Sequence, residues 1–106
     1  MELTELAQVL KALGDATRLK IISLLRVRDF CVCELVPLFD ISQPAISKHL
    51  SRLKTVGIVS EQRKGQWVFY SLNNSVLKQL CVDLDELPDM SAELTRLGSE
   101  GKLVCE

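Results

Sequence analysis

One stretch of the chain, residues 42–57, constrains the fold more than any other. Its sequence is SQPAISKHLSRLKTVG. Ser42 is a favourable helix N-cap residue, and Pro44 suits the first turn of a helix. Apolar residues then recur at spacings of four and three, on one stripe of a helix: Ile46, Leu50 and Leu53. The stretch therefore predicts an amphipathic helix that packs on a core through one face.

The opposite face of this predicted helix is small, polar and basic. It carries Pro44, Ser47, Lys48, Ser51, Arg52 and Thr55, and no acidic residue lies between Gln43 and Thr55. Cations beside short hydroxyl side chains suit a DNA groove lined by phosphates. An ordinary solvated helix face is the alternative, because charge patterning discriminates weakly. His49, at the flank of the apolar stripe, has either a packing or capping role or a DNA contact.

The residues before this stretch predict three further helices. Residues 2–13 carry leucines at helical spacing, and residues 16–26, capped by Asp15, have a wide apolar stripe. A shorter helix is expected over residues 31–38, where Pro37 comes awkwardly late. Two short helices joined by a tight turn form a helix-turn-helix, whose second helix enters the major groove of DNA.

After Gly57 the pattern changes from helix to strand. Residues 58–63 and 66–72 are rich in β-branched and aromatic side chains, and Lys64-Gly65 is the predicted turn between them. A hairpin directly after a helix-turn-helix is the wing of a winged helix. Its basic tip, Arg63 and Lys64, suits contact with backbone phosphate, although exposed turns are often charged.

A last long helix is predicted over residues 74–87, and one more short helix within residues 88–106. The helices at 2–13 and 74–87 are more apolar than one small core needs, so we expect them to pair with the same helices of a second subunit. The expected fold is mainly α with a small β-hairpin, a winged helix-turn-helix in the order α-α-α-α-β-β-α. Residues 1–87 form the DNA-binding and dimerisation domain of this homodimer, and residues 88–106 a C-terminal tail.

The charge of the chain is unevenly distributed. The net charge is −1, but residues 48–64 hold five cations against Glu61 alone, and residues 83–106 hold seven acids against two cations. The basic segment can form a local DNA-binding surface that the net charge of the whole chain does not reveal. No long apolar run or cationic leader is present, which predicts a cytoplasmic protein. The helix-turn-helix, its basic face and the expected two-fold dimer make double-stranded operator DNA the expected partner, without a membrane or a small organic substrate. No motif of an enzyme is found.

The chain has four cysteines, which without an export signal predict free thiols or metal ligands. Cys31 and Cys33 are expected at a helix N-terminus near Arg26 and Arg28, a setting that favours thiolate. Soft trivalent ions prefer thiolate ligands. Two residues apart on a regular helix, however, side chains point about 200° away from each other. One ion can therefore bind both thiols only if the first turn distorts, and that distortion would reach the reading helix.

Four segments, taken together, resemble the ArsR/SmtB family of small winged-helix, metal-responsive repressors. They are ALGDATRLKIISLL, CVCEL, SQPAISKHLSRLKTVGIV and RKGQWVFYSL, and the resemblance runs from about Leu6 to Leu87. It implies a homodimer that binds a palindromic operator without ligand and releases it when ligand binds. It also implies that Gln43, Pro44, Ser47 and Lys48 contact bases or nearby phosphates. The charge pattern adds Ser51, Arg52, Arg63 and Lys64 to this predicted interface.

The CVCEL segment resembles the family's arsenic- and antimony-sensing segment, which implies As(III) or Sb(III) as inducer and no permanent cofactor. Some members have a third cysteine where this chain has Val36. Trivalent arsenic prefers three thiolates, and the candidates for the third are first Cys105, then Cys81, a cysteine of a second subunit or an external thiol. Cys81, on the apolar face of the last helix, is by default a buried structural thiol. A repressor of the same fold that responds to another soft metal or to thiol oxidation is the alternative.

Overall fold

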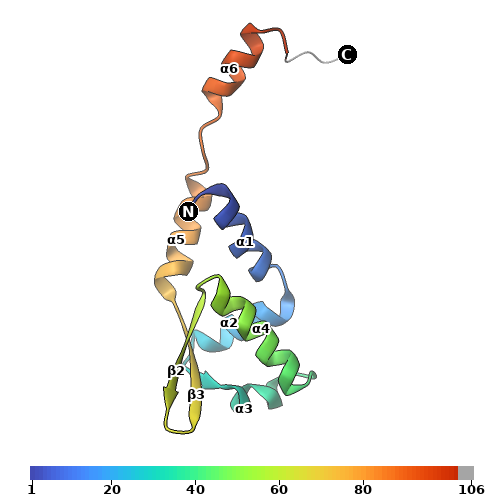
Figure 1. Ribbon diagram of the computed structural model, residues 1–106, viewed down its shortest axis with the longest axis vertical. Helices are drawn as coiled ribbons and strands as arrows, with labels where there is room; N and C mark the ends of the chain where they lie inside the picture. Colours follow the sequence, from blue (N-terminus) through green and yellow to red (C-terminus); the bar gives the residue numbers. More distant parts are fainter. Residues whose placement is uncertain (103–106) are drawn as a thin grey trace.

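The computed structural model describes residues 1–102, and its elements follow the winged helix-turn-helix order (Figure 1). The helices and strands are α1 (Leu3–Leu13), α2 (Ala16–Leu25), β1 (Phe30–Cys31), α3 (Val32–Leu35), a 3₁₀ turn η1 (Val36–Leu38), α4 (Gln43–Thr55), β2 (Val59–Lys64), β3 (Trp67–Leu72), α5 (Asn74–Asp85) and α6 (Ser91–Ser99). The predicted helix-turn-helix and hairpin are confirmed. No helix within residues 1–102 is long and apolar enough to cross a membrane.

The apolar stripe of α4 lies at the centre of the core. Ile46, Leu50 and Leu53 are fully buried, as the spacing predicts. They pack in one cluster with Ile21 of α2 and Leu35 of α3, which are also fully buried. Each such side chain contributes about 1.5–3 kcal/mol by leaving water. This packing fixes the rotation of α4 about its axis and turns the polar face outward.

Both ends of α4 are set by local hydrogen bonds. The Ser42 hydroxyl accepts a bond from the Ala45 backbone N–H at 3.3 Å, so the predicted N-cap is confirmed. At the other end the N–H of Gly57 donates to the Lys54 carbonyl, and that of Ile58 donates to the Leu53 carbonyl, each at 3.0 Å. Gly57 has φ +81°. These are the two bonds of a Schellman motif, which ends the helix and directs the chain into β2.

The sheet has three strands rather than the two expected. β1 pairs antiparallel with β3, with Phe30 opposite Tyr70 and Cys31 opposite Phe69, and the strand order is β1-β3-β2. The predicted helix over residues 31–38 is therefore wrong at its start. Cys31 belongs to a strand, because the free edge of β3 pairs with it, and the α-helix runs only from Val32 to Leu35.

The hairpin turn also lies one residue later than predicted. Lys64 pairs with Trp67, so Gly65 and Gln66 form the two-residue loop. Gly65 has φ +64°, and no non-glycine residue within residues 1–102 has a positive φ. A single positive φ at the first loop position is typical of a II′ turn, which matches the twist of the strands. Arg63 and Lys64 thus end β2 beside the turn.

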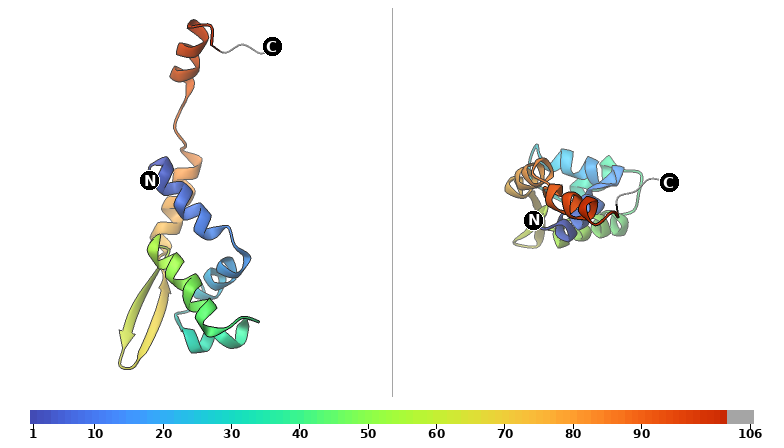
Figure 2. Two further views of the ribbon diagram at one scale, coloured as in Figure 1. Left: turned by 45° about the vertical axis from the view of Figure 1, so that its right-hand side comes forward. Right: turned by 90° about the horizontal axis from the view of Figure 1, so that it is seen from above.

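The C-terminal part of the described chain stands away from the rest. Figures 1 and 2 show α6 beyond the end of α5, joined to it by an extended segment. The structure measures 64 × 27 × 19 Å and has a radius of gyration of 19.3 Å, against about 13 Å for a compact chain of this length. α6 confirms the extra short helix expected in the tail. Large apolar side chains on α1, α5 and α6 stay exposed: Leu3, Leu10, Val82, Leu84 and Leu94.

Candidate nucleic-acid interface and thiol site

The outward face of α4 carries the residues predicted to contact DNA. Gln43, Pro44, Lys48, Ser51 and Arg52 are exposed, and Ser47 is half-buried. Since the buried stripe occupies the other side of the helix, this face is available to a groove. It holds no acidic side chain, so its electrostatic potential is set by its cations.

The four predicted interface cations form no ion pair with a carboxylate of the part of the chain that the structure describes. None of the ion pairs formed within residues 1–102 includes Lys48, Arg52, Arg63 or Lys64. Lys54, by contrast, binds Glu61 at 2.7 Å, and this bond holds the pKa of the Glu61 carboxyl below its ordinary value. The cations on α4 and at the hairpin tip are therefore available to phosphate, whereas Lys54 is engaged by Glu61.

His49 has a partner inside the protein. Its Nδ1 lies 3.0 Å from Nη1 of Arg18 on α2. An arginine only donates hydrogen bonds, so Nδ1 accepts this one and the ring proton sits on Nε2. Arg18 also donates through Nε to the Ala12 carbonyl. Of the two roles considered for His49, the packing role is the one that this bond supports.

The two thiols of the CVC segment lie together. The Sγ atoms of Cys31 and Cys33 are 2.6 Å apart. The expectation that they point about 200° away from each other is wrong, because Cys31 is not in the helix. It is the extended N-cap residue of α3, with φ −89° and ψ 163°. The chain therefore brings the thiols to one place without distorting a helical turn.

Glu34 holds this junction of strand and helix. Its Oε1 accepts a bond from the Cys31 backbone N–H at 3.0 Å, which closes a capping box with Cys31 as N-cap. Its Oε2 lies 3.1 Å from Arg28, whose guanidinium also stacks on the Phe30 ring at 3.9 Å. The bond from the Cys31 N–H and then the bond from Arg28 hold the pKa of the Glu34 carboxyl below its ordinary value.

The electrostatics of Cys31 also differ from expectation. Burial raises the pKa of the Cys31 thiol above its ordinary value, and the hydrogen bond with Cys33 acts in the same direction. A lowered pKa was expected from Arg26 and Arg28, but the charge of Arg28 is directed to Glu34. Cys31 is only 6% exposed, whereas Cys33 is open to solvent. Cys33 is thus the thiol that a ligand meets first.

The described part of the chain places no third protein ligand beside the pair. Cys81 lies on α5 and is exposed in the single chain, so it is not the buried structural thiol expected there. Cys105 lies outside the described residues. Within residues 1–102 no three His, Cys, Asp or Glu side chains are placed to hold one metal ion.

A hollow that is not predicted from the sequence lies beside the thiols. It measures about 260 Å³ and is lined by Cys31, Cys33, Glu34, Trp67 and Phe69. The two aromatic residues come from β3, opposite β1 in the sheet. Their alternation in the sequence places both on one face of a strand. The pairing of that strand with the cysteine segment has no local signal in the sequence.

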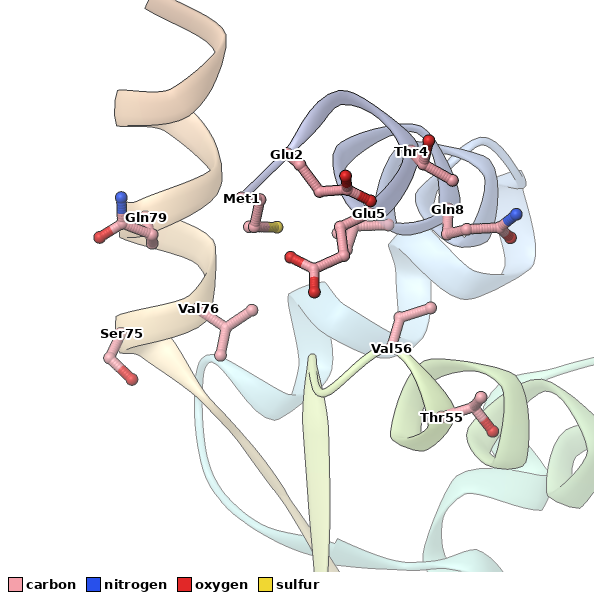
Figure 3. Close-up of a pocket in the computed structure, with 11 residues that line it drawn as sticks. Met1, Glu2, Thr4, Glu5, Gln8, Thr55, Val56, Ser75, Val76 and Gln79 are labelled. Atoms are coloured by element: carbon pink, nitrogen blue, oxygen red, sulfur yellow. The ribbon is translucent and has the colours of Figure 1, made fainter. Parts of the chain in front are cut away.

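A larger hollow, of about 730 Å³, lies elsewhere, between α1, α5 and the end of α4 (Figure 3). Met1, Glu5, Val56, Val76 and Gln79 are among its lining residues. It is remote in sequence from the thiols and carries no cysteine. Because α1 and α5 are the helices expected to pair with a second subunit, we interpret this hollow as part of a surface that the single chain leaves open.

Comparison with known proteins gives a consistent result. Residues 15–61 match the model of the bacterial regulatory protein, arsR family. The arsenic resistance transcriptional regulator ArsR1 of Pseudomonas putida is 41% identical over 86 residues, 80% of this chain and 67% of that protein.

Two solved structures share the fold. An ArsR-like transcriptional regulator from Rhodococcus sp. RHA1 superposes with a TM-score of 0.73 at 30% identity, over 97% of this chain and 94% of that one. A homodimeric winged helix-turn-helix DNA-binding domain from Mycobacterium bovis, described as a possible ArsR-family regulator, has a TM-score of 0.68 at 27% identity, over 82% of this chain and 84% of that one.

Proposed function

Because the chain belongs to the arsR family of bacterial regulatory proteins, which are DNA-binding transcriptional regulators and not enzymes, we propose that it represses transcription as a homodimer. The dimer binds a palindromic operator and leaves it when trivalent arsenic or antimony binds Cys31 and Cys33. The observation that carries the proposal is the adjacency of these two thiols, 2.6 Å apart, on the segment that precedes the reading helix.

The proposed DNA contacts are the outward face of α4 and the tip of the wing. On α4 they are Gln43, Pro44, Ser47, Lys48, Ser51 and Arg52, and on the wing Arg63 and Lys64. The cations among them have no carboxylate partner within residues 1–102, which supports phosphate contacts. Each phosphate neutralised adds about one counterion to the salt dependence of binding.

The proposed dimer pairs α1 and α5 of two chains. Exposed Leu10 on α1 and exposed Val82 and Leu84 on α5 support it, since a soluble chain rarely leaves several large apolar side chains of neighbouring helices in water. The hollow between α1 and α5 lies in the same region. A two-fold dimer presents two reading helices, which is why the expected operator is palindromic.

The proposed inducer is a soft trivalent ion. Arsenous acid exchanges hydroxyl groups for thiols: at Cys31 and Cys33 two As–O bonds break, two As–S bonds form, and each thiol proton leaves with a hydroxyl as water. A third thiol replaces the last hydroxyl by the same exchange. The third ligand is Cys105, or else Cys81, a cysteine of the second subunit or an external thiol. The relative named for arsenic resistance supports this choice of ion.

Release follows from the contact between the thiol segment and the reading helix. Two sulfurs on one ion lie up to about 4 Å apart when each bond is near 2.3 Å, so a bound ion replaces the hydrogen-bonded contact between the two Sγ atoms with a fixed separation and direction. α3 packs against α4 through Leu35, which is fully buried. A shift of about 3–4 kcal/mol in favour of a conformer that fits DNA poorly weakens binding about 10²–10³-fold.

The test uses fluorescence anisotropy of a labelled duplex from the chain's own promoter region. Arsenite is expected to release the wild type but not C31S, while C31S still binds the duplex. C81S removes one candidate for the third ligand and is expected to keep the response if Cys105 or an external thiol completes the site. Release of C31S at the same arsenite concentration would remove the thiol pair from the mechanism.

A second candidate signal is oxidation, because two thiols 2.6 Å apart are placed to form a disulfide once an oxidant is present. In that case peroxide releases the operator, a reductant restores binding, and C33S abolishes the response. If peroxide leaves the duplex bound while arsenite releases it, oxidation is not the signal.

A further inference from the structure

The hollow beside the thiols is walled by aromatic rings of the wing strand. Trp67 and Phe69 line it together with the two cysteines and Glu34. Phe69 is the ladder partner of Cys31, which fixes the ring next to the thiol segment. Trp67 is the chain's only tryptophan and pairs with Lys64 at the wing tip. Its large apolar side chain is half exposed. A half-exposed indole beside two thiols offers a contact surface to a ligand bound by the thiols.

The number of thiols limits the ligand. Trivalent arsenic forms three bonds, and within residues 1–102 the site supplies two sulfurs. Glu34 is occupied by the Cys31 backbone N–H and Arg28. The other lining residues are the two aromatic side chains, which offer carbon surface instead of a third donor atom. The hollow is smaller than the roughly 300 Å³ at which drug-sized pockets begin, which suits a small substituent.

We propose that Trp67 and Phe69 complete the thiol site as an aromatic wall that selects a trivalent arsenical carrying one apolar carbon substituent, such as a methyl or phenyl group. The inference rests on the proposed function, because it refines the inducer of the same thiol pair. An arsenical with one carbon group needs only two sulfurs, and its third substituent lies against aromatic carbon.

The binding step balances without an oxidant or a reductant. The ligand R–As(OH)₂ loses both hydroxyl groups, two As–S bonds replace two As–O bonds, and the two thiol protons leave with the hydroxyls as two waters. The As–C bond is untouched and arsenic stays trivalent. With arsenous acid the third bond of arsenic goes to a further thiol or stays with a hydroxyl, and neither gives the rings a carbon substituent to pack against.

The experiment compares two ligands on the full chain. Protein reduced with a phosphine, so that no external thiol is present, is bound to labelled promoter duplex and titrated with phenylarsine oxide or with arsenite. The fluorescence of Trp67 reports occupancy of the site, and the anisotropy of the duplex reports release. For each variant the measured quantity is the ratio of the two half-release concentrations, which cancels differences in DNA affinity between variants.

The wild type is expected to favour the phenyl compound, and W67A to reduce that ratio about tenfold, as the loss of one aromatic contact predicts. W67F is expected to restore most of it. In the wild type the phenyl compound is expected to change tryptophan emission more than arsenite does. An unchanged ratio in W67A, or an equal loss for both ligands, would overturn the inference.

The outcomes separate this inference from the proposed function. If both ligands release C31S as readily as the wild type, the thiol pair is not the sensor and the proposed function fails. If both ligands release the wild type but not C31S, and W67A keeps the wild-type ratio, the sensor stands and only the aromatic wall is refuted. Circular dichroism of W67A and W67F shows whether either variant is folded before the ratios are compared.

Discussion

Replacing Gly57 with alanine tests the junction between the reading helix and the wing. Gly57 has φ +81°, and an added Cβ meets no heavy atom within 4 Å. The change therefore has a conformational penalty without a clash. A left-handed backbone costs an L-residue about 1–2 kcal/mol. Alanine also lowers the conformational entropy of the unfolded chain, which stabilises the folded state by about 0.4–1 kcal/mol. The expected net loss is about 1 kcal/mol, which lowers the Tm of a domain of this size by roughly 4–8 °C.

The assay is thermal and urea unfolding at one fixed protein concentration, because a dimer's stability depends on concentration. G57N is expected to fall between the wild type and G57A, since asparagine tolerates the left-handed region better than alanine. G98A is the matched control: Gly98 lies in α6 with ordinary φ and open space around it, so alanine there raises helicity. A loss in G57A below about 0.3 kcal/mol or above about 3 kcal/mol would refute the reasoning.

Three further predictions concern the interface, the dimer and the thiols. K48A is expected to weaken operator binding and to lower the slope of log affinity against log salt concentration by about one. Anisotropy across salt concentrations measures both, and K78A on α5 is expected to leave both unchanged. An unchanged slope in K48A would show that this face does not contact the DNA. L84D is expected to sediment as a monomer where the wild type is a dimer, because it puts a carboxylate into an apolar contact; a dimeric L84D would place the interface elsewhere. Since the pKa of Cys31 is raised, iodoacetamide is expected to modify Cys33 first at pH 7, and the rate at Cys31 to rise about tenfold per pH unit up to its pKa, as mass spectrometry would show; equal rates at pH 7 would contradict this.

Much of the reading unit could be predicted from the sequence because its signals are local. The Ser42 cap and the buried stripe of Ile46, Leu50 and Leu53 follow from spacing and capping within one helix. The hairpin follows from residue type, and only its turn was placed one residue early. These features depend on neighbours in the chain, so a single sequence carries them.

The thiol site could be predicted only in part, because it depends on a contact between distant residues. The CVC spacing identified the two cysteines, but their relative direction was predicted wrongly. Two residues are too few to show a strand by alternation, and β1 exists because it pairs with β3, about 40 positions later. The same pairing brings Trp67 and Phe69 to the thiols, so the aromatic wall could not be inferred from either segment alone.

That pairing limits how the thiol pair can be moved into another protein. A short peptide carrying the two cysteines, moved by itself into another regulator, would lose the ladder that keeps Cys31 extended. It would become an ordinary helical turn whose sulfurs diverge. The transferable unit is two separate pieces of chain, residues 30–35 and residues 67–70, and a recipient scaffold must supply the geometry that holds them side by side.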